Sequence, residues 1–156
     1  MTPQIRVLAC GAIDRGDDGV ALRAVHSLPR SARQAAQIDV LGYLSPEALI
    51  GDAPGLPRLV LDCLAGLPGG EIIDLPLADL PDLESRMRTT STHALAPGAA
   101  VAIAALLGAV RPGDRFLGIG GERFDVGDDL SPAVCAQLGA LVERMTTRIE
   151  EARPCA

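Results

Sequence analysis

Five short apolar runs recur along this sequence, and segments with a helical pattern separate most of them. Each run has the length of a strand and is too short for an ordinary helix: 4–9, 38–41, 59–62, 71–75 and 115–119. Strands that alternate with helices are typical of a layered α/β domain. The order strand, helix, strand, helix, strand, strand, helix, strand, helix therefore predicts a single three-layer α/β/α domain over residues 1–156.

The predicted helices have recognisable starts and ends. Ser45 and Ser131 are good N-caps, and each is followed by a proline at the first helical position. Pro29 is expected to close the first helix. These signals, with the apolar spacing, predict helices over about 20–28, 46–50, 97–110 and 132–151. Residues 76–92 are polar and predicted to be irregular. Runs 59–62 and 71–75 flank Gly69-Gly70 and are predicted to form a hairpin, so that the sheet is mixed.

The composition excludes several classes of function. The 156 residues are 48% hydrophobic, enough for one buried core. A net charge of −6 and an aromatic content of 2% leave no basic footprint and no stacking platform for nucleic acid. The longest apolar run, 97–110, is too short to span a membrane. No targeting segment is visible, so we expect a cytoplasmic protein with no nucleic-acid or membrane partner.

Four cysteines occur, at positions 10, 63, 135 and 155, and no two form a C-x-x-C pair. In a reducing cytoplasm they are expected to be free and mostly buried thiols. Cys10 and Cys63 each end a predicted strand, so either thiol could approach a site there, although packing is the more ordinary role.

Three polar features are predicted to meet at the carboxyl ends of the strands, where open α/β sheets place their functional crevice. They are the acidic turn 11–19, Asp62 after an apolar run, and the hydroxyl-rich segment that ends in His93. Each has an ordinary explanation: a helix start, a strand-end carboxylate and a helix-start histidine. Together, two carboxylates and an imidazole suit a divalent transition metal. His26, within the first helix, is interpreted as scaffold.

A phosphate-binding glycine loop is a competing interpretation of the turn 11–19. The pattern G-x-G-x-x-G is not met, because Ile13 stands where its second glycine would be. Asp14, Asp17 and Asp18 would also repel a pyrophosphate. A nucleotide binder is therefore disfavoured, and Asp17 is left as a residue that could orient the loop or assist a proton transfer.

Five motifs, in order along the chain, resemble those of hydrogenase maturation endopeptidases. They are Gly11 to Gly19 (GAIDRGDDG), Gly42 to Glu47 (GYLSPE), Leu59 to Asp62 (LVLD), Thr90 to His93 (TSTH) and Phe116 to Ile119 (FLGI). The resemblance covers almost the whole chain. It implies a three-layer fold with a mixed, roughly five-stranded twisted sheet.

The resemblance also implies a function. Proteins of this family remove a C-terminal peptide from the large-subunit precursor of nickel–iron hydrogenase after nickel has been inserted. The family's metal-binding residues correspond here to Asp18, Asp62 and His93. These three are the expected catalytic and nickel-binding residues, with the nickel supplied by the precursor, which is the expected partner.

The chain departs from the family pattern in two places. Ala12 stands where the family usually has asparagine, and Gly120-Gly121 stands where it usually has Gln-Pro. The three ligand positions are kept. The alternative that these departures support is a non-catalytic metal-binding or adaptor protein with the same fold. No Ser-His-Asp or Cys-His set is visible in the sequence, because Ser91 lies only two residues before His93.

Overall fold

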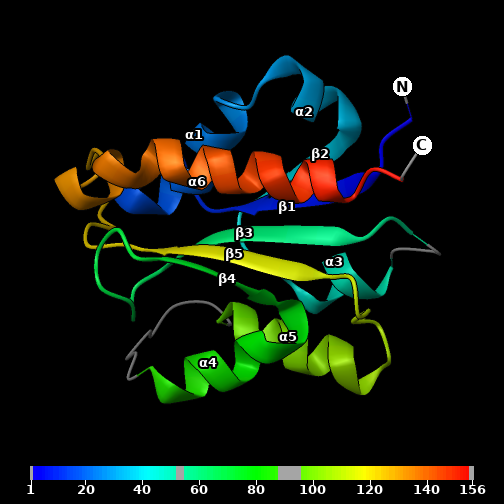
Figure 1. Ribbon diagram of the computed structural model, residues 1–156. Coiled ribbons are helices and arrows are strands. Elements are labelled where there is room, and N and C mark those ends of the chain that lie inside the picture. The colour runs from blue at the N-terminus through cyan, green and yellow to red at the C-terminus, as the bar shows by residue number, and fades with distance from the viewer. Residues whose placement is uncertain (1, 52–54, 88–95, 155–156) are drawn as a thin grey trace.

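The computed structural model describes residues 2–51, 55–87 and 96–154, and its centre is a five-stranded sheet (Figure 1). The strands are β1 (Ile5–Cys10), β2 (Ala36–Leu41), β3 (Arg58–Leu64), β4 (Ile72–Pro76) and β5 (Arg115–Gly120). Their order is β2-β1-β3-β5-β4. Strands β2, β1, β3 and β5 are parallel to one another, and β4 is antiparallel to β5. The predicted mixed α/β sheet is confirmed.

Helices cover both faces of the sheet (Figure 1). One layer holds α1 (Val20–His26), α2 (Arg30–Ala35) and α6 (Pro132–Glu151). The other holds α3 (Pro46–Ile50), α4 (Leu80–Arg86) and α5 (Pro97–Leu106). Two 3-10 turns, η1 (Gly16–Gly19) and η2 (Leu77–Asp79), lead into α1 and α4. In the described part of the chain, no helix combines the length and apolarity needed to cross a bilayer.

Alternate residues of the central strands build two separate cores. Val7, Leu59 and Leu117 belong to the cluster under α1, α2 and α6. Their neighbours Leu8, Val60 and Phe116 belong to the cluster under α3, α4 and α5. Because side chains alternate across a strand, even-numbered positions of β3 face α4 and α5. That alternation decides the direction of Asp62.

The hairpin predicted for runs 59–62 and 71–75 is wrong, because β5 lies between β3 and β4. The core strand β3 is buried on both faces and pairs in parallel with β1 and β5. The partly buried β4 pairs only with β5, as an edge strand. A run of four apolar residues indicates a strand but carries no information about which neighbour it takes.

Three helix predictions also need correction. Pro29 begins α2 as its N-cap rather than only closing α1. The segment predicted to be irregular contains η2 and α4, with Pro81 in the first turn of α4. The helix predicted over 97–110 ends at Leu106, because the backbone turns at Gly108 with a φ of 70°. The predicted start of α6 is confirmed: the Ser131 side chain accepts the Val134 N–H.

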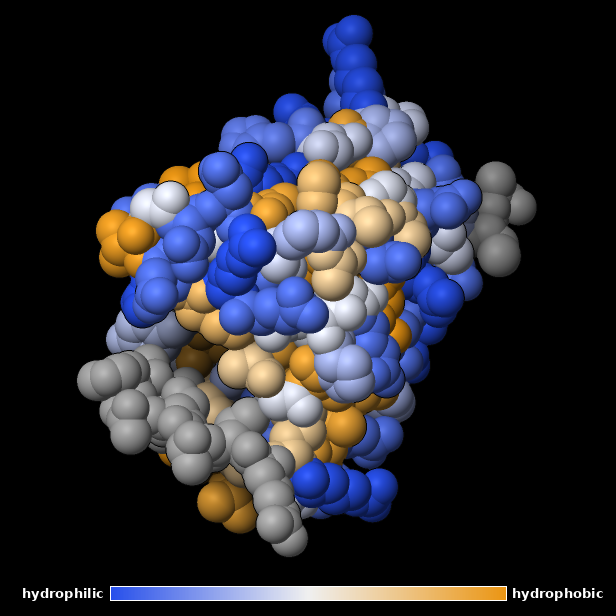
Figure 2. All heavy atoms as spheres, turned by 90° about the vertical axis from the view of Figure 1, so that its left-hand side faces the viewer, coloured by the Kyte–Doolittle hydropathy of each residue, from blue (hydrophilic) through white to orange (hydrophobic). Residues whose placement is uncertain are grey.

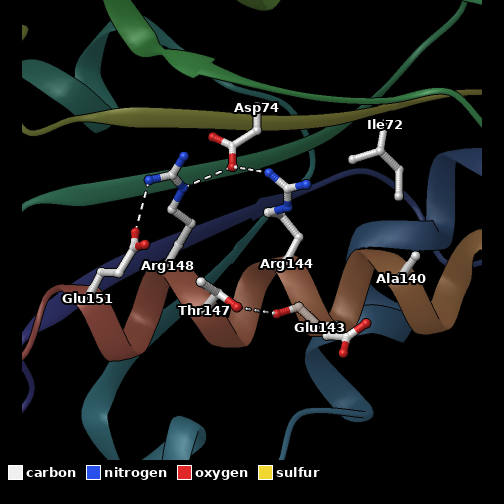
Figure 3. Close-up of a pocket in the computed structure, with 8 residues that line it drawn as sticks. All are labelled: Ile72, Asp74, Ala140, Glu143, Arg144, Thr147, Arg148 and Glu151. Carbon is white, nitrogen blue, oxygen red and sulfur yellow. Dashed lines mark hydrogen bonds and ion pairs between the residues drawn. The ribbon is translucent and has the colours of Figure 1, made fainter.

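A groove of about 610 Å³ runs between the edge strand β4 and helix α6. Figure 3 shows Asp74 of β4 reaching toward Arg144 and Arg148 of α6. The distances from Asp74 are 2.8 Å to Arg148, 2.8 Å to Arg115 of β5 and 3.4 Å to Arg144. Burial works toward a higher pKa for Asp74, but hydrogen bonds from Arg148 and Arg115 outweigh it and lower the pKa. Asp74 therefore joins α6 to the sheet.

Asp74→Asn is expected to cost about 2 kcal/mol of stability at pH 7, since it weakens hydrogen bonds between charged groups that are only partly exposed. A group with a lowered pKa in the fold stabilises it above the unfolded pKa, near 4, and loses that effect on acidification. Urea unfolding at pH 7 and pH 3 checks this. The difference between the variant and the native chain should shrink at pH 3, and an equal difference at both pH values would contradict it.

Candidate functional site

The parallel strands β1, β3 and β5 end at one edge of the sheet, and their loops form the face that Figure 2 shows. In Figure 1 this edge is at the left, where the loops after β1 and β5 lie. Figure 2 shows a hollow in this face. The position is the one that the sequence indicated for the candidate site.

The turn after β1 is closed by a hydrogen bond to the Asp18 side chain. The carboxylate of Asp18 accepts the N–H of Ala12 at 2.9 Å. Gly11 has a φ of 130°, and a Cβ at this position would lie 1.9 Å from the Asp18 carbonyl oxygen. Only glycine fits there. The turn thus holds Asp18 at the end of β1, and its backbone closes on a carboxylate rather than forming a cradle for phosphate.

Asp17 points the other way, into the protein, and is fully buried. Its carboxylate accepts three backbone N–H groups, from Glu122 at 2.7 Å, Arg123 at 3.0 Å and Ser131 at 2.7 Å. Burial favours a higher pKa for Asp17, but these hydrogen bonds outweigh it and lower the pKa. Asp17 therefore ties the loop after β5 to the turn that carries Asp18. This is the orienting role, and full burial removes Asp17 from proton transfer.

Asp62 lies on β3 and faces the side of the sheet covered by α4 and α5, as its even position requires. One of its oxygens accepts the N–H of Cys63 at 2.8 Å. Burial raises the pKa of Asp62 to about 7, and the negative charges of Asp18 and Glu84 add to the rise. The fold therefore brings Asp18 and Asp62 close enough for their charges to interact, from positions 44 residues apart in the sequence.

Glu84 is a member of this acidic group that the sequence interpretation missed. It lies on α4, inside the segment predicted to be irregular, and it is partly buried. Its carboxylate accepts the N–H of Gly98 in the first turn of α5 at 2.9 Å. A signal was available in the sequence: Leu77, Leu80 and Leu83 recur every three residues around Pro81, as in a short helix.

Two cysteines flank the carboxylates and are buried. Burial raises the pKa of the Cys10 thiol, and the charges of Asp62 and Asp18 raise it further. Burial and the same two carboxylates, with Asp17, also raise the pKa of Cys63. Both shifts disfavour the thiolate, which is the form of cysteine that acts as a nucleophile. Of the three described cysteines, only Cys135 is exposed, on α6, so the thiols are mostly buried as expected; Cys155 lies outside the described residues.

The third predicted ligand, His93, lies outside the described residues, as do Thr90 and Ser91. Within the described ranges, no three His, Cys, Asp or Glu side chains form a group that could hold a metal ion. His26 is exposed on α1, in line with the scaffold role expected of it.

The structure explains why glycines stand at positions 120 and 121. A Cβ at Gly120 would lie 2.0 Å from the carbonyl oxygen of Pro68. A Cβ at Gly121 would lie 2.4 Å from the Cys63 sulfur and 2.6 Å from the Phe124 ring. Backbone atoms thus fill the space beside Gly120, and side chains fill the space beside Gly121. Ala12 keeps its backbone bond to Asp18, so the lack of an asparagine side chain leaves the turn intact.

Comparison with known proteins yields structural neighbours and no sequence match. No protein-family model matches the chain, and the search of curated proteins found no significant match. Among solved structures, the hydrogenase maturating endopeptidase HybD from E. coli is 20% identical, with a TM-score of 0.69, covering 95% of this chain and 93% of that one. The [NiFe] hydrogenase maturation protease HybD from Thermococcus kodakarensis is 21% identical, with a TM-score of 0.63, covering 92% and 97%.

A third neighbour, a hydrogenase 3 maturation protease, is 21% identical with a TM-score of 0.61, covering 98% of this chain and 93% of that one. Identities of this size establish a shared fold, and here they do so over nearly the full length of both chains. The fold expected from the five motifs is therefore confirmed.

Proposed function

We propose that this chain is a hydrogenase maturation endopeptidase that removes the C-terminal peptide of a nickel–iron hydrogenase large-subunit precursor in the cytoplasm. One observation carries the proposal. In a fold shared with proteases of that name, the carboxylates of Asp18, on the turn after β1, and Asp62, near the end of β3, are close enough for their charges to interact. A backbone N–H holds each carboxylate in place: that of Ala12 binds Asp18, and that of Cys63 binds Asp62.

The side chains available suit a divalent transition metal. Asp18 and Asp62 each use one carboxylate oxygen in a hydrogen bond to the backbone, and within the described ranges the other oxygen of each accepts none. With the imidazole of His93, they would supply three ligands of types that nickel accepts and leave positions open for the precursor. We propose that the nickel arrives bound to the precursor.

Asp18, Asp62 and His93 would hold the metal ion, which would polarise a peptide carbonyl and lower the pKa of water. Asp62 is fixed on a strand and Asp18 on a turn that admits only glycine at position 11, so both are preorganised. Completing the ligand set only with a nickel-loaded precursor would also confine cleavage to that form.

The test is intact-mass analysis of a nickel-loaded large-subunit precursor from the matching hydrogenase. We expect the native chain to remove a C-terminal peptide, and we expect Asp62→Ala and His93→Ala to leave the precursor at full mass. Glu150→Ala, which removes an exposed carboxylate from the last turn of α6, is the matched control and should process normally. Normal trimming by His93→Ala would eliminate the proposed ligand set.

The second candidate, a metal-binding adaptor with no catalysis, is favoured by Ala12 and by the filled space beside Gly120 and Gly121. It makes a different prediction for the same samples. The native chain would bind the precursor, seen as co-elution in gel filtration, with no loss of precursor mass. In that event Ala12→Asn is the first variant to make.

A further inference from the structure

The contact between Glu84 and Gly98 joins α4 to the start of α5 beside the proposed site. Glu84 Oε2 accepts the Gly98 N–H at 2.9 Å, and this N–H is one of those that an α-helix leaves without an internal partner. The acceptor is a carboxylate at the positive end of α5, so the hydrogen bond is charge-assisted. It is a directed contact between two helices.

The backbone at Gly98 is fitted to this carboxylate. A Cβ at position 98 would lie 2.3 Å from Glu84 Oε2 and 2.8 Å from its Cδ, so any other residue would push the carboxylate away. The next nearest atom, the Cα of Pro81, would be 3.3 Å away, a contact that a small shift relieves. Gly98 is therefore needed here because Glu84 is present.

The charge of the same carboxylate also acts on Asp62. Asp62 faces the α4 and α5 side of β3. Glu84 does not complete a metal-binding group with Asp18 and Asp62, since no three acidic or thiol side chains form one in the described ranges. Its carboxylate already accepts a hydrogen bond from the Gly98 N–H. Glu84 thus borders the site through a contact that fixes the neighbouring helix.

We infer that Glu84 is a positioning residue of the proposed site: its hydrogen bond to Gly98 sets the first turn of α5 against α4, on the side of the sheet that Asp62 faces. The inference rests on the proposed function. It predicts that nickel affinity depends on the hydrogen-bond acceptor at position 84 more than on its charge.

The test measures the affinity of the full chain for Ni²⁺ by calorimetry, in the native chain and five variants. Glu84→Ala should bind nickel about tenfold more weakly, the usual effect of removing a partner just outside a ligand set. Glu84→Gln keeps an acceptor for the Gly98 N–H and should stay within about threefold of the native chain. Asp82→Ala removes an exposed carboxylate from the same helix and should change nothing.

The last two variants form a double-mutant cycle. Gly98→Ala should weaken nickel binding as much as Glu84→Ala, because the new Cβ displaces the carboxylate. In the Glu84→Ala background, the same change should cause no further loss, because the atom it would strike is gone. Three results together identify a positioning residue: the two single variants lose equal nickel affinity, the double variant loses no more, and glutamine at position 84 restores binding. A residue that only stabilises the fold would not give all three. Equal losses for Glu84→Gln and Glu84→Ala, or additive losses in the cycle, would overturn the inference.

NMR separates this outcome from a failure of the proposed function. The chain has two histidines, so Ni²⁺ should broaden the His93 imidazole signals and leave those of the exposed His26 unchanged. If His93 is unaffected in the native chain, the proposed ligand set is wrong. Amide exchange at Gly98 then still decides the role of Glu84. It should be slow in the native chain and in Glu84→Gln but fast in Glu84→Ala, and equal rates would overturn the inference.

Discussion

Replacing Asp62 by asparagine is expected to make the folded chain more stable at alkaline pH while ending its proposed processing activity. Burial, with the charges of Asp18 and Glu84, raises the pKa of this carboxyl group to about 7. The charged form is therefore disfavoured where it lies. Asparagine keeps an oxygen to accept the Cys63 N–H and removes the charge, so the hydrogen bond at 2.8 Å can persist.

The pH dependence follows from the direction of the shift. In the unfolded chain Asp62 loses its proton near pH 4, whereas in the fold it does so near pH 7. The folded state thus holds more protons across this window, and its stability falls as the pH rises from about 4 to 7. Above pH 7 the full penalty applies. A shift of this size corresponds to at most about 4 kcal/mol, which Asp62→Asn should recover in part.

Urea denaturation at pH 4 and pH 8 measures this effect. The variant should match the native chain at pH 4 and exceed it at pH 8. Asp39→Asn removes a carboxylate that pairs with Arg6 on the outer part of the sheet, and it should show no such gain. A variant at position 62 that is less stable than the native chain at pH 8 would mean that Asp62 is a structural residue. Stability gained with activity lost is the signature of a functional carboxylate.

Much of the fold could be predicted from the sequence because its signals are local. The five strands, the caps at Ser45 and Ser131, and the layered order all follow from patterns within a few residues. Strand pairing is not local, so β4 was assigned to β3 although β5 separates them. The polar character of residues 76–92 predicts irregular structure and hides the helix α4, whose first turn contains Pro81.

The site residues also divide into those that local sequence patterns predict and those that depend on tertiary packing. Asp62 and the acidic turn 11–19 could be named because each follows an apolar run and the carboxyl edge of an α/β sheet is predictable, whereas Asp18 was chosen within that turn by the family resemblance. Glu84 could not be named, because its relevance depends on α4 packing against α5 and over Asp62. Asp17 and Asp18 are adjacent acids in the sequence, and no local pattern separates the buried one from the one at the site. The three N–H groups that Asp17 accepts come from residues more than 100 positions away.

Asp17→Ala is expected to destabilise the fold by about 3–5 kcal/mol, among the largest effects of any single substitution in this chain. It removes the acceptor of three backbone N–H groups, from Glu122, Arg123 and Ser131, and leaves a void in a fully buried position. The loop after β5 would lose these side-chain links to η1, the turn that carries Asp18, and would keep the backbone hydrogen bonds from Gly16 and Asp17. Thermal unfolding and urea denaturation at pH 7 measure the loss. Asp14→Ala, which removes an exposed carboxylate from the same turn, is the matched control.

Acidification should change the stability of the fold in opposite directions through Asp17 and Asp62. The pKa of Asp17 is lowered in the fold, so its contribution is complete above the unfolded pKa, near 4, and is lost as the pH falls through the lowered value. The contribution of Asp62 is lost as the pH rises toward 7. The native chain should therefore be most stable near pH 4, with Asp17 setting the acidic limit and Asp62 the alkaline one. Asp62→Asn should extend this range upward only.

Asp17→Asn, which removes a carboxylate acceptor but keeps the shape of the side chain, should lower the stability of the fold most above pH 4. A stability curve in which Asp17→Asn and the native chain differ equally at pH 2 and pH 6 would show that its carboxylate is not what holds the two loops together.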